Sequence, residues 1–127
     1  MGVLEPRNSF LTGDARQSAG TGGRVYRVSE LLGELKRLVQ EGVGYAWVEG
    51  EVSDFRRPTS GHIYFVLKDE RARLHAAYFR GRQQEGVSVR DGDLVRVFGL
   101  VSVYEARSEV QIVVEQVVPQ GRGVLLE

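Results

Sequence analysis

Hydrophobic and polar residues alternate along three neighbouring stretches, Tyr45–Phe55, His62–Lys68 and Ala72–Arg80. Successive side chains of a strand point to opposite faces, so each stretch separates into two sets of residues. One set is apolar and suits a core: Val48, Gly50, Val52, Ile63, Phe65, Leu67, Leu74, Ala76 and Tyr78. The other set mixes aromatic, basic and acidic side chains: Trp47, Glu49, Glu51, Ser53, His62, Tyr64, Val66, Lys68, Arg73, His75, Ala77 and Phe79. We therefore predict three strands with a core on one face and a solvated functional surface on the other.

Ahead of these strands, the spacing of the apolar residues changes to that of a helix. Between residues 29 and 41, leucine and valine recur at helical spacing and form one apolar stripe. Ser29 is a suitable N-cap, and Gly42 suits the position just beyond the helix. We predict a short amphipathic helix whose stripe closes one end of the apolar sheet.

Alternation returns after the third strand. Residues 81–92 have no clean period and predict a connection, with room for one helical turn. A long strand then starts at Asp93, and Gly99 in its middle permits the bend or bulge that closing a small barrel requires. The last strand is expected over Glu109–Val118, ended by Pro119. The fold class is therefore mainly β: a five-stranded barrel of the oligonucleotide/oligosaccharide-binding (OB) kind, preceded by one amphipathic helix.

The flanking segments differ from this barrel in composition. Residues 1–24 are rich in Gly, Ser, Thr and Arg and are expected to form a flexible amino-terminal tail. The barrel domain is expected over residues 25–119. Residues 120–127 are expected to begin a linker to a domain that the chain does not contain.

Basic side chains concentrate in the part of the chain that carries the three alternating stretches. The whole sequence balances 17 Lys and Arg against 17 Asp and Glu. Between Arg56 and Arg82, however, seven basic residues face two acidic ones, so this window carries +5 and the remainder −5. Cations attract phosphates and flat rings stack on unpaired bases, so the mixture is typical of a single-stranded nucleic acid site. Charge alone is equally compatible with a face that only keeps the protein soluble.

Bulk composition narrows the class of protein. The chain has no cysteine, which excludes a disulfide framework and thiolate metal sites and fits a cytoplasmic protein. No apolar run is long enough to span a membrane, and no signal peptide is recognisable. A pI near 6.8 excludes a generally basic coat protein but allows a local positive patch.

Two carboxylates and two histidines could instead indicate a catalytic or metal centre. Glu49 and Glu51 share a face, but no His or Asp is placed to complete a metal site, so we interpret them as surface groups paired with arginines. His62 and His75 lack a third ligand, and both nucleic-acid contact and a plain surface position stay open for them. We predict no catalytic residue, metal or cofactor here.

Other aromatic residues have two interpretations each. Trp47 is outward by alternation, and packing under the helix is favoured over stacking on a base. OB barrels flank the ligand with the loop between the first two strands and the loop before the last strand. Tyr104 stacking on a base with Arg107 on a phosphate is therefore a hypothesis, set against a simple hairpin turn. Phe55 could belong to the core edge or to the site.

The most specific signature is the run WVEGEVSDFRRPTSGHIYFVLKD. Together with VSELLGELKRL, AYFRGR and VSVYEARSEVQIVVE, it resembles the amino-terminal part of the large subunit of exodeoxyribonuclease VII over about residues 26–125. The resemblance implies an OB-fold domain that binds single-stranded DNA. It also implies an enzyme that degrades such DNA from both ends to oligonucleotides and that pairs one large subunit with several small helical subunits.

The resemblance also implies what this chain lacks. The family's nuclease domain and helical region follow the OB domain, so we expect a binding domain without hydrolytic activity, and small-subunit contacts only in the absent carboxy-terminal region. Positions that match the family's pattern become DNA-contact candidates: Arg56, Arg57, His62, Tyr64, Lys68, Phe79, Arg80 and Arg82. The outward face and the last loop add four more: Arg73, His75, Tyr104 and Arg107.

Three functions share this fold and charge pattern. A single-stranded DNA-binding module is expected to bind with strong salt dependence and little sequence preference. An RNA- or tRNA-binding barrel would differ by its use of the 2′-hydroxyl. A protein-interaction barrel would dock an acidic partner or its own copy on the positive face.

Overall fold

The computed structural model describes residues 23–86 and 88–121. The chain divides into two units, Met1–Leu31 and Leu32–Glu127, and all of the strands named below belong to the second. The expected tail over 1–24 lies almost entirely outside the described residues, as do residues 122–127 of the expected linker. The domain limits 25–119 therefore stay a prediction.

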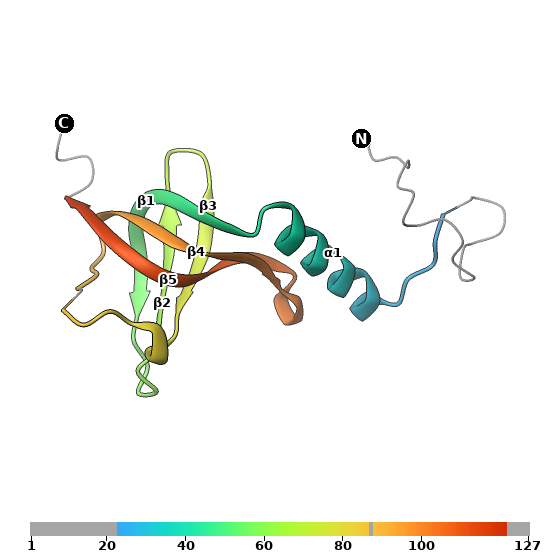
Figure 1. Cartoon of the computed structure of the whole chain (residues 1–127), viewed down its shortest axis with the longest axis horizontal. Coiled ribbons are helices and arrows are strands. Elements are labelled where there is room, and N and C mark those ends of the chain that lie inside the picture. Colours follow the sequence, from blue (N-terminus) through green and yellow to red (C-terminus); the bar gives the residue numbers. More distant parts are fainter. Residues whose placement is uncertain (1–22, 87, 122–127) are drawn as a thin grey trace. The chain divides into compact units, whose positions relative to one another are not determined.

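Within the described residues, five strands form one closed barrel (Figure 1). They are β1 (Tyr45–Arg56), β2 (Ile63–Lys68), β3 (Arg73–Tyr78), β4 (Leu94–Tyr104) and β5 (Glu109–Gly121). The order around the barrel is β1-β2-β3-β5-β4, and the pairs are antiparallel except for β3 and β5. The parallel pairing of β3 with β5 closes the barrel. The structure thus confirms the predicted five-stranded OB-fold barrel preceded by one helix.

The core consists of the side chains that alternation placed inward. Six of the nine predicted core side chains are at most 4% exposed: Val52, Ile63, Phe65, Leu67, Ala76 and Tyr78. Val48 and Leu74 are half-buried against them, and β4 and β5 add further valines and Ile112. Burying one such side chain contributes about 1.5–3 kcal/mol, so this cluster is the main source of barrel stability.

Two residues of the predicted outward set are buried as well. Val66 is 5% exposed and Ala77 4% exposed, although both lie on the outer face. Val66 lies opposite His75 and Ala77 opposite Tyr64, so each has a larger side chain beside it on the same face. The prediction that the whole outward set is solvated is wrong at these two positions.

The bend of β4 falls where the sequence predicted it. The pairing with β5 shifts between Phe98 and Gly99, and a side chain at Gly99 would collide with the carbonyl oxygen of Val113. The bulge therefore requires glycine. In contrast, the expectation that Pro119 ends the last strand is wrong, because β5 continues to Gly121. Pro119 lies beside a second register shift, where its missing N–H interrupts no regular ladder.

The helix α1 (Val28–Gly42) forms in the predicted region but begins differently. The N–H of Arg27 donates to the Glu30 carboxylate at 3.0 Å, and the carbonyl of Arg27 accepts the first helical bond from Leu31. Arg27 is therefore the N-cap, and Ser29 is not. Among the described residues no helix is long and apolar enough to cross a membrane.

The position of the helix stripe also differs from the prediction. None of the residues of α1 is buried, and Leu35 is 41% exposed. The expectation that α1 closes an end of the sheet is therefore wrong. Its last turn contacts β4 through one hydrogen bond, in which the Gln40 amide donates to the Ser102 hydroxyl at 2.8 Å.

The connection from β3 to β4 is mostly a loop. It starts with the one-turn 3-10 helix η2 (Arg80–Arg82), in the place where a helical turn was allowed for. Val89 from this loop is 7% exposed and belongs to the core. Gln84 fixes the loop to the barrel, because its main-chain N–H donates to the Tyr78 hydroxyl at 2.9 Å and its amide oxygen accepts from Val117 at 2.8 Å.

Candidate nucleic-acid interface

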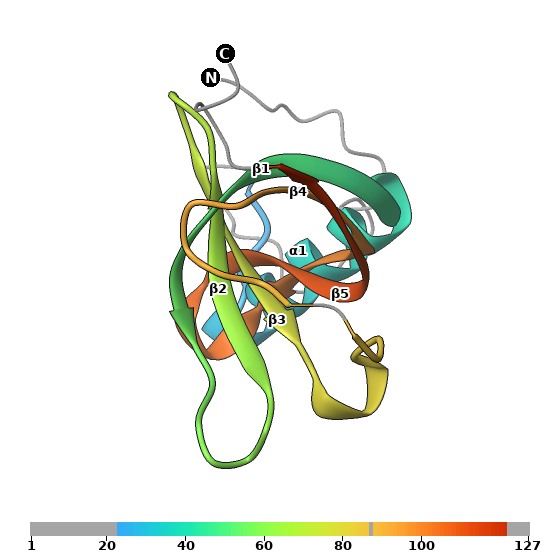
Figure 2. The same cartoon turned by 90° about the vertical axis from the view of Figure 1, so that its left-hand side faces the viewer.

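Six of the predicted DNA-contact residues line one groove of about 390 Å³ on the outer face of the barrel. We call it the β2–β3–β5 groove. It is lined by Arg56, Tyr64, Phe65, His75, Ala76, Ala77, Phe79, Tyr104, Arg107, Glu109 and Gln111. The loop between β1 and β2 and the η2 turn extend from the same end of the barrel, opposite the β2–β3 turn (Figure 2). The structure thus brings together residues that lie as far apart in the sequence as Arg56 and Arg107, and their role in binding stays a prediction.

A bulge in β1 turns Arg56 into the groove. The pairing of β1 with β2 shifts between Ser53 and Arg56, and Asp54 there adopts a φ of 53°. Strict alternation would place Arg56 on the core face with Val52. The extra residue reverses this, so that Phe55 packs against the core and Arg56 faces out. The Arg56 guanidinium then lies 5.4 Å from the centre of the Tyr64 ring, in a cation–π contact.

The rings of Tyr64 and Phe79 form one wall of the groove, and His62, which is not among the lining residues, contacts both. His62 contacts Phe79 edge-to-face at 5.3 Å between ring centres and Tyr64 at 6.5 Å. Nδ1 of His62 accepts the main-chain N–H of Arg80 at 2.9 Å, which holds the imidazole in place and favours a proton on the other nitrogen. Phe79 is 37% exposed, so part of its ring is free to stack.

The opposite wall comes from the turn between β4 and β5. Here η3 (Glu105–Arg107) makes one 3-10 turn, and Ser108 closes it in the left-handed conformation with φ 55°. Tyr104, 48% exposed, precedes the turn, and Arg107 ends it. The buried Ala77 of β3 lies between the walls and is too small to obstruct the groove.

The other candidates lie outside the groove. Arg57 is exposed on the β1–β2 loop next to Arg56, and Lys68 lies opposite Arg73 near the β2–β3 turn. Arg73 forms an ion pair with Asp54 at 2.7 Å. Arg80 and Arg82 are exposed on η2, where Arg82 forms an ion pair with Glu115. Exposed pairs of this kind contribute about 0–1 kcal/mol and open easily, so a role for these residues in binding stays a prediction.

Two residues of the groove were absent from the predicted site. Glu109 and Gln111 share the outer face of β5, and Glu109 lies directly opposite Tyr104. The carboxylate of Glu109 is 3.8 Å from Nε2 of His75. Alternation in the last strand already placed both residues on the outer face. They were not predicted as contacts because neither side chain is basic or aromatic.

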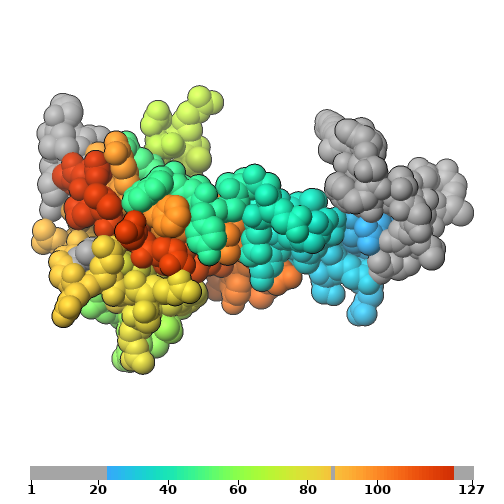
Figure 3. All heavy atoms as spheres, viewed as in Figure 1, coloured from blue at the N-terminus to red at the C-terminus, as the bar shows by residue number. Residues whose placement is uncertain are grey.

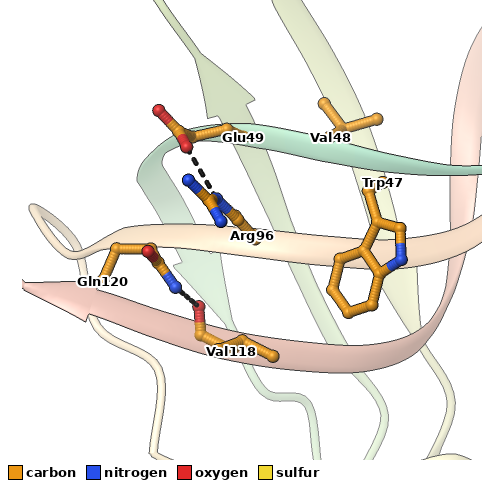
Figure 4. A pocket seen from close by; sticks show the side chains of 6 residues that line it. All are labelled: Trp47, Val48, Glu49, Arg96, Val118 and Gln120. Carbon is orange, nitrogen blue, oxygen red and sulfur yellow. Dashed lines mark hydrogen bonds and ion pairs between the residues drawn. The ribbon is translucent and has the colours of Figure 1, made fainter.

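A second hollow of about 430 Å³ lies on the outer face of β1, β4 and β5 (Figure 4), whose atoms meet on the face of the molecule drawn in Figure 3. Its lining includes Trp47, Val118 and the ion pair of Glu49 with Arg96, at 2.9 Å. Trp47 is 53% exposed and packs on Phe98 at 5.3 Å between ring centres, so the interpretation that it packs under the helix is wrong. The charges that line this hollow neutralise each other, whereas the β2–β3–β5 groove has two arginines and one carboxylate.

The acidic pair on β1 behaves as a surface feature. Glu49 is paired with Arg96, as the interpretation of a surface carboxylate predicted. Among the described residues, no group of three or more His, Cys, Asp or Glu is arranged to hold a metal ion.

Comparison with known families defines the class of protein. A family described as "OB-fold nucleic acid binding domain" matches residues 26–118, which include every strand of the barrel except the last residues of β5. The chain belongs to this family. The β2–β3–β5 groove therefore lies on the outer surface of a barrel from a nucleic-acid-binding family.

The comparison also gives more particular relatives. The chain is 40% identical over 110 residues to the exodeoxyribonuclease 7 large subunit of Shewanella baltica (strain OS155), covering 85% of this chain and 24% of that protein. It is 42% identical over 105 residues to that of Shewanella loihica, covering 81% and 24%. These findings confirm the resemblance seen in the sequence, and the chain spans about a quarter of the length of these relatives. A solved chain titled "Structure and Conformational Change of a Replication Protein A Heterotrimer Bound to ssDNA" is similar with a TM-score of 0.49 and 13% identity, covering 60% of this chain and 57% of that chain.

Proposed function

We propose that the β2–β3–β5 groove binds single-stranded DNA. The observation that supports this is the lining itself: Arg56 at the end of β1 and Arg107 at the end of η3 share one groove with the rings of Tyr64, Phe79 and Tyr104. Arginines attract the phosphates, and exposed rings stack on bases that no complementary strand covers. A double helix offers no such unpaired bases, so the groove suits a single strand.

We propose further that the chain supplies strand binding to an exodeoxyribonuclease 7 large subunit in the cytoplasm. Hydrolysis and the contacts with a small subunit are then assigned to the three-quarters of the relatives' length that this chain does not span. The chain alone is expected to leave a labelled oligonucleotide intact in the presence of Mg²⁺. Cleavage that disappears in Glu49→Gln would place catalysis in this barrel and contradict the assignment.

Fluorescence anisotropy with labelled oligo(dT) tests the binding function. The affinity should fall steeply with salt, because each phosphate neutralised on a single strand contributes about 0.7 to the slope of log K against log salt. Arg56→Ala combined with Arg57→Ala should reduce the slope by up to about 1.4. The matched control is Arg71→Ala with Arg90→Ala, which removes the same charge from exposed positions outside the groove.

The outcome also separates the two alternatives. Binding that is absent, or that salt does not change, would contradict the proposal. Tighter binding of a matched RNA oligonucleotide would favour an RNA-binding barrel, because only RNA offers the 2′-hydroxyl. A self-associated species in sedimentation, together with no competition by oligonucleotides, would favour a protein-interaction surface.

A further inference from the structure

The β2–β3–β5 groove contains one carboxylate among its described lining residues, that of Glu109. Its side chain is 36% exposed, and it lies opposite Tyr104 in the β4–β5 ladder. Residues in this relation have Cβ atoms about 4.5–5.5 Å apart. The acid therefore stands beside a ring that, on the proposed function, stacks on a base.

The carboxylate lacks a permanent positive partner in the part of the chain that the structure describes. Its one ion-pair partner there is His75, at 3.8 Å, and His75 carries charge only when protonated. A carboxylate and a phosphate both accept hydrogen bonds and repel each other. Repulsion therefore keeps the phosphates of a bound strand away from Glu109, so that the edges of its bases face the carboxylate.

The chemistry of Glu109 then selects among bases. An ionised carboxylate is a hydrogen-bond acceptor only, so it needs a donor on the base edge. The exocyclic amino group of cytosine is such a donor, and carboxylates accept from it in protein–DNA complexes. Thymine and uracil carry a carbonyl oxygen at the same ring position, and their N3–H donor is flanked by two carbonyl oxygens that would face the carboxylate unfavourably. The neighbouring Gln111 both donates and accepts, so it does not discriminate.

We propose that Glu109 gives the groove a preference for bases with an amino group on their edge, cytosine over thymine or uracil. This inference rests on the proposed function and refines it. Phosphate contacts and stacking would supply most of the affinity for any sequence, and Glu109 would add a selective contact at one base position.

Oligo(dC) and oligo(dU) of equal length test the preference, because their rings differ only at positions 3 and 4, on the edge that would face Glu109. At pH 8 and fixed salt, the protein should bind oligo(dC) about tenfold more tightly. Glu109→Gln should bring the ratio close to one, mainly by improving the binding of oligo(dU), because the amide can donate to the carbonyl. Glu70→Gln, in the β2–β3 turn, removes the same charge outside the groove and should keep the tenfold ratio.

Each result has one meaning. Equal binding of the two oligonucleotides by the unmodified protein, or a ratio that survives in Glu109→Gln, overturns the preference while the proposed function stands. A ratio lost equally in Glu70→Gln also overturns it, because net charge would then be the cause. No binding of either oligonucleotide overturns the proposed function and, with it, this inference.

Discussion

At the scale of single residues, rings and guanidinium groups should support binding in ways that can be told apart. On the proposed function, the exposed ring of Phe79 would stack on a base and contribute about 1–3 kcal/mol, whatever the salt concentration. Arg107 would act through the phosphates, so its contribution would weaken as salt rises. Substitutions at the two positions should therefore differ in their effect on the salt dependence of the affinity.

Phe79→Ala should lower the affinity for oligo(dT) about tenfold and leave the salt slope unchanged. Arg107→Ala should reduce the slope by about 0.7. Anisotropy over a salt series measures both quantities, and Phe79→Tyr serves as a control that keeps a stacking ring. Equal slopes for Arg107→Ala and the parent protein would remove Arg107 from the phosphate contacts.

A second prediction at this scale concerns the β2–β3 turn. The Asp69 carboxylate accepts the main-chain N–H groups of Arg71 at 2.8 Å and Ala72 at 2.9 Å, and these bonds hold the pKa of Asp69 below its usual range. A lowered folded-state pKa contributes stability above the unfolded pKa, and this stability is lost as pH falls through the folded value.

Asp69→Ala should therefore have a lower midpoint of urea unfolding than the parent protein at pH 7. The gap should begin to narrow below about pH 4, where Asp69 of the unfolded chain protonates, and should close once the pH falls below the lowered pKa of the folded protein. Asp69→Asn, whose amide oxygen still accepts, should fall between them. A gap that stays constant down to pH 3 would show that the two hydrogen bonds are not its cause.

At the scale of elements, the bulge in β1 determines which residue reaches the groove. Asp54 tolerates the left-handed conformation, which costs most L-residues about 1–2 kcal/mol. A β-branched side chain is particularly unfavourable there. If the bulge is lost, alternation turns Arg56 back toward the core face.

Asp54→Val should therefore weaken oligo(dT) binding at least as much as Arg56→Ala. Asp54→Gly keeps the conformation, and Asp54→Asn keeps it while removing the ion pair with Arg73, so both should bind almost normally. Anisotropy with thermal melting separates lost binding from unfolding. Weak binding by all three variants would indicate that the ion pair, and not the bulge, supports the site.

The same bulge shows how far sequence reasoning extends. Alternation is a local property, so it predicted the strands and the inward side chains such as Phe65 and Ile63 correctly. It could not detect an extra residue at Asp54, because nothing in the pattern marks a φ of 53°. The apolar stripe of α1 suggested burial for the same local reason, but burial depends on which surfaces meet in the fold. The contact candidates were chosen by residue type, so Glu109 was not among them; its place beside Tyr104 follows from the pairing of β4 with β5.

At the scale of the whole barrel, the two hollows offer a choice between two surfaces. The β2–β3–β5 groove has an excess of positive charge, whereas the hollow on β1, β4 and β5 has the ring of Trp47 but a balanced pair of charges. Rings without cations can stack on bases but cannot attract the phosphates between them. We therefore expect the strand to use the first surface and to leave the second free.

Trp47 is the single tryptophan of the sequence, and it lies in the second hollow, 53% exposed. Its fluorescence therefore reports on that surface alone. Saturating oligo(dT) should leave the intensity nearly unchanged, and Trp47→Phe should bind within about twofold of the parent protein, because stacking on Trp47 would otherwise contribute about 1–3 kcal/mol per base. Saturable quenching, or a tenfold loss in Trp47→Phe, would move the strand to the β1–β4–β5 surface. Quenching together with the losses expected for Phe79→Ala and Arg107→Ala would instead mean that the strand winds around the barrel and contacts both surfaces.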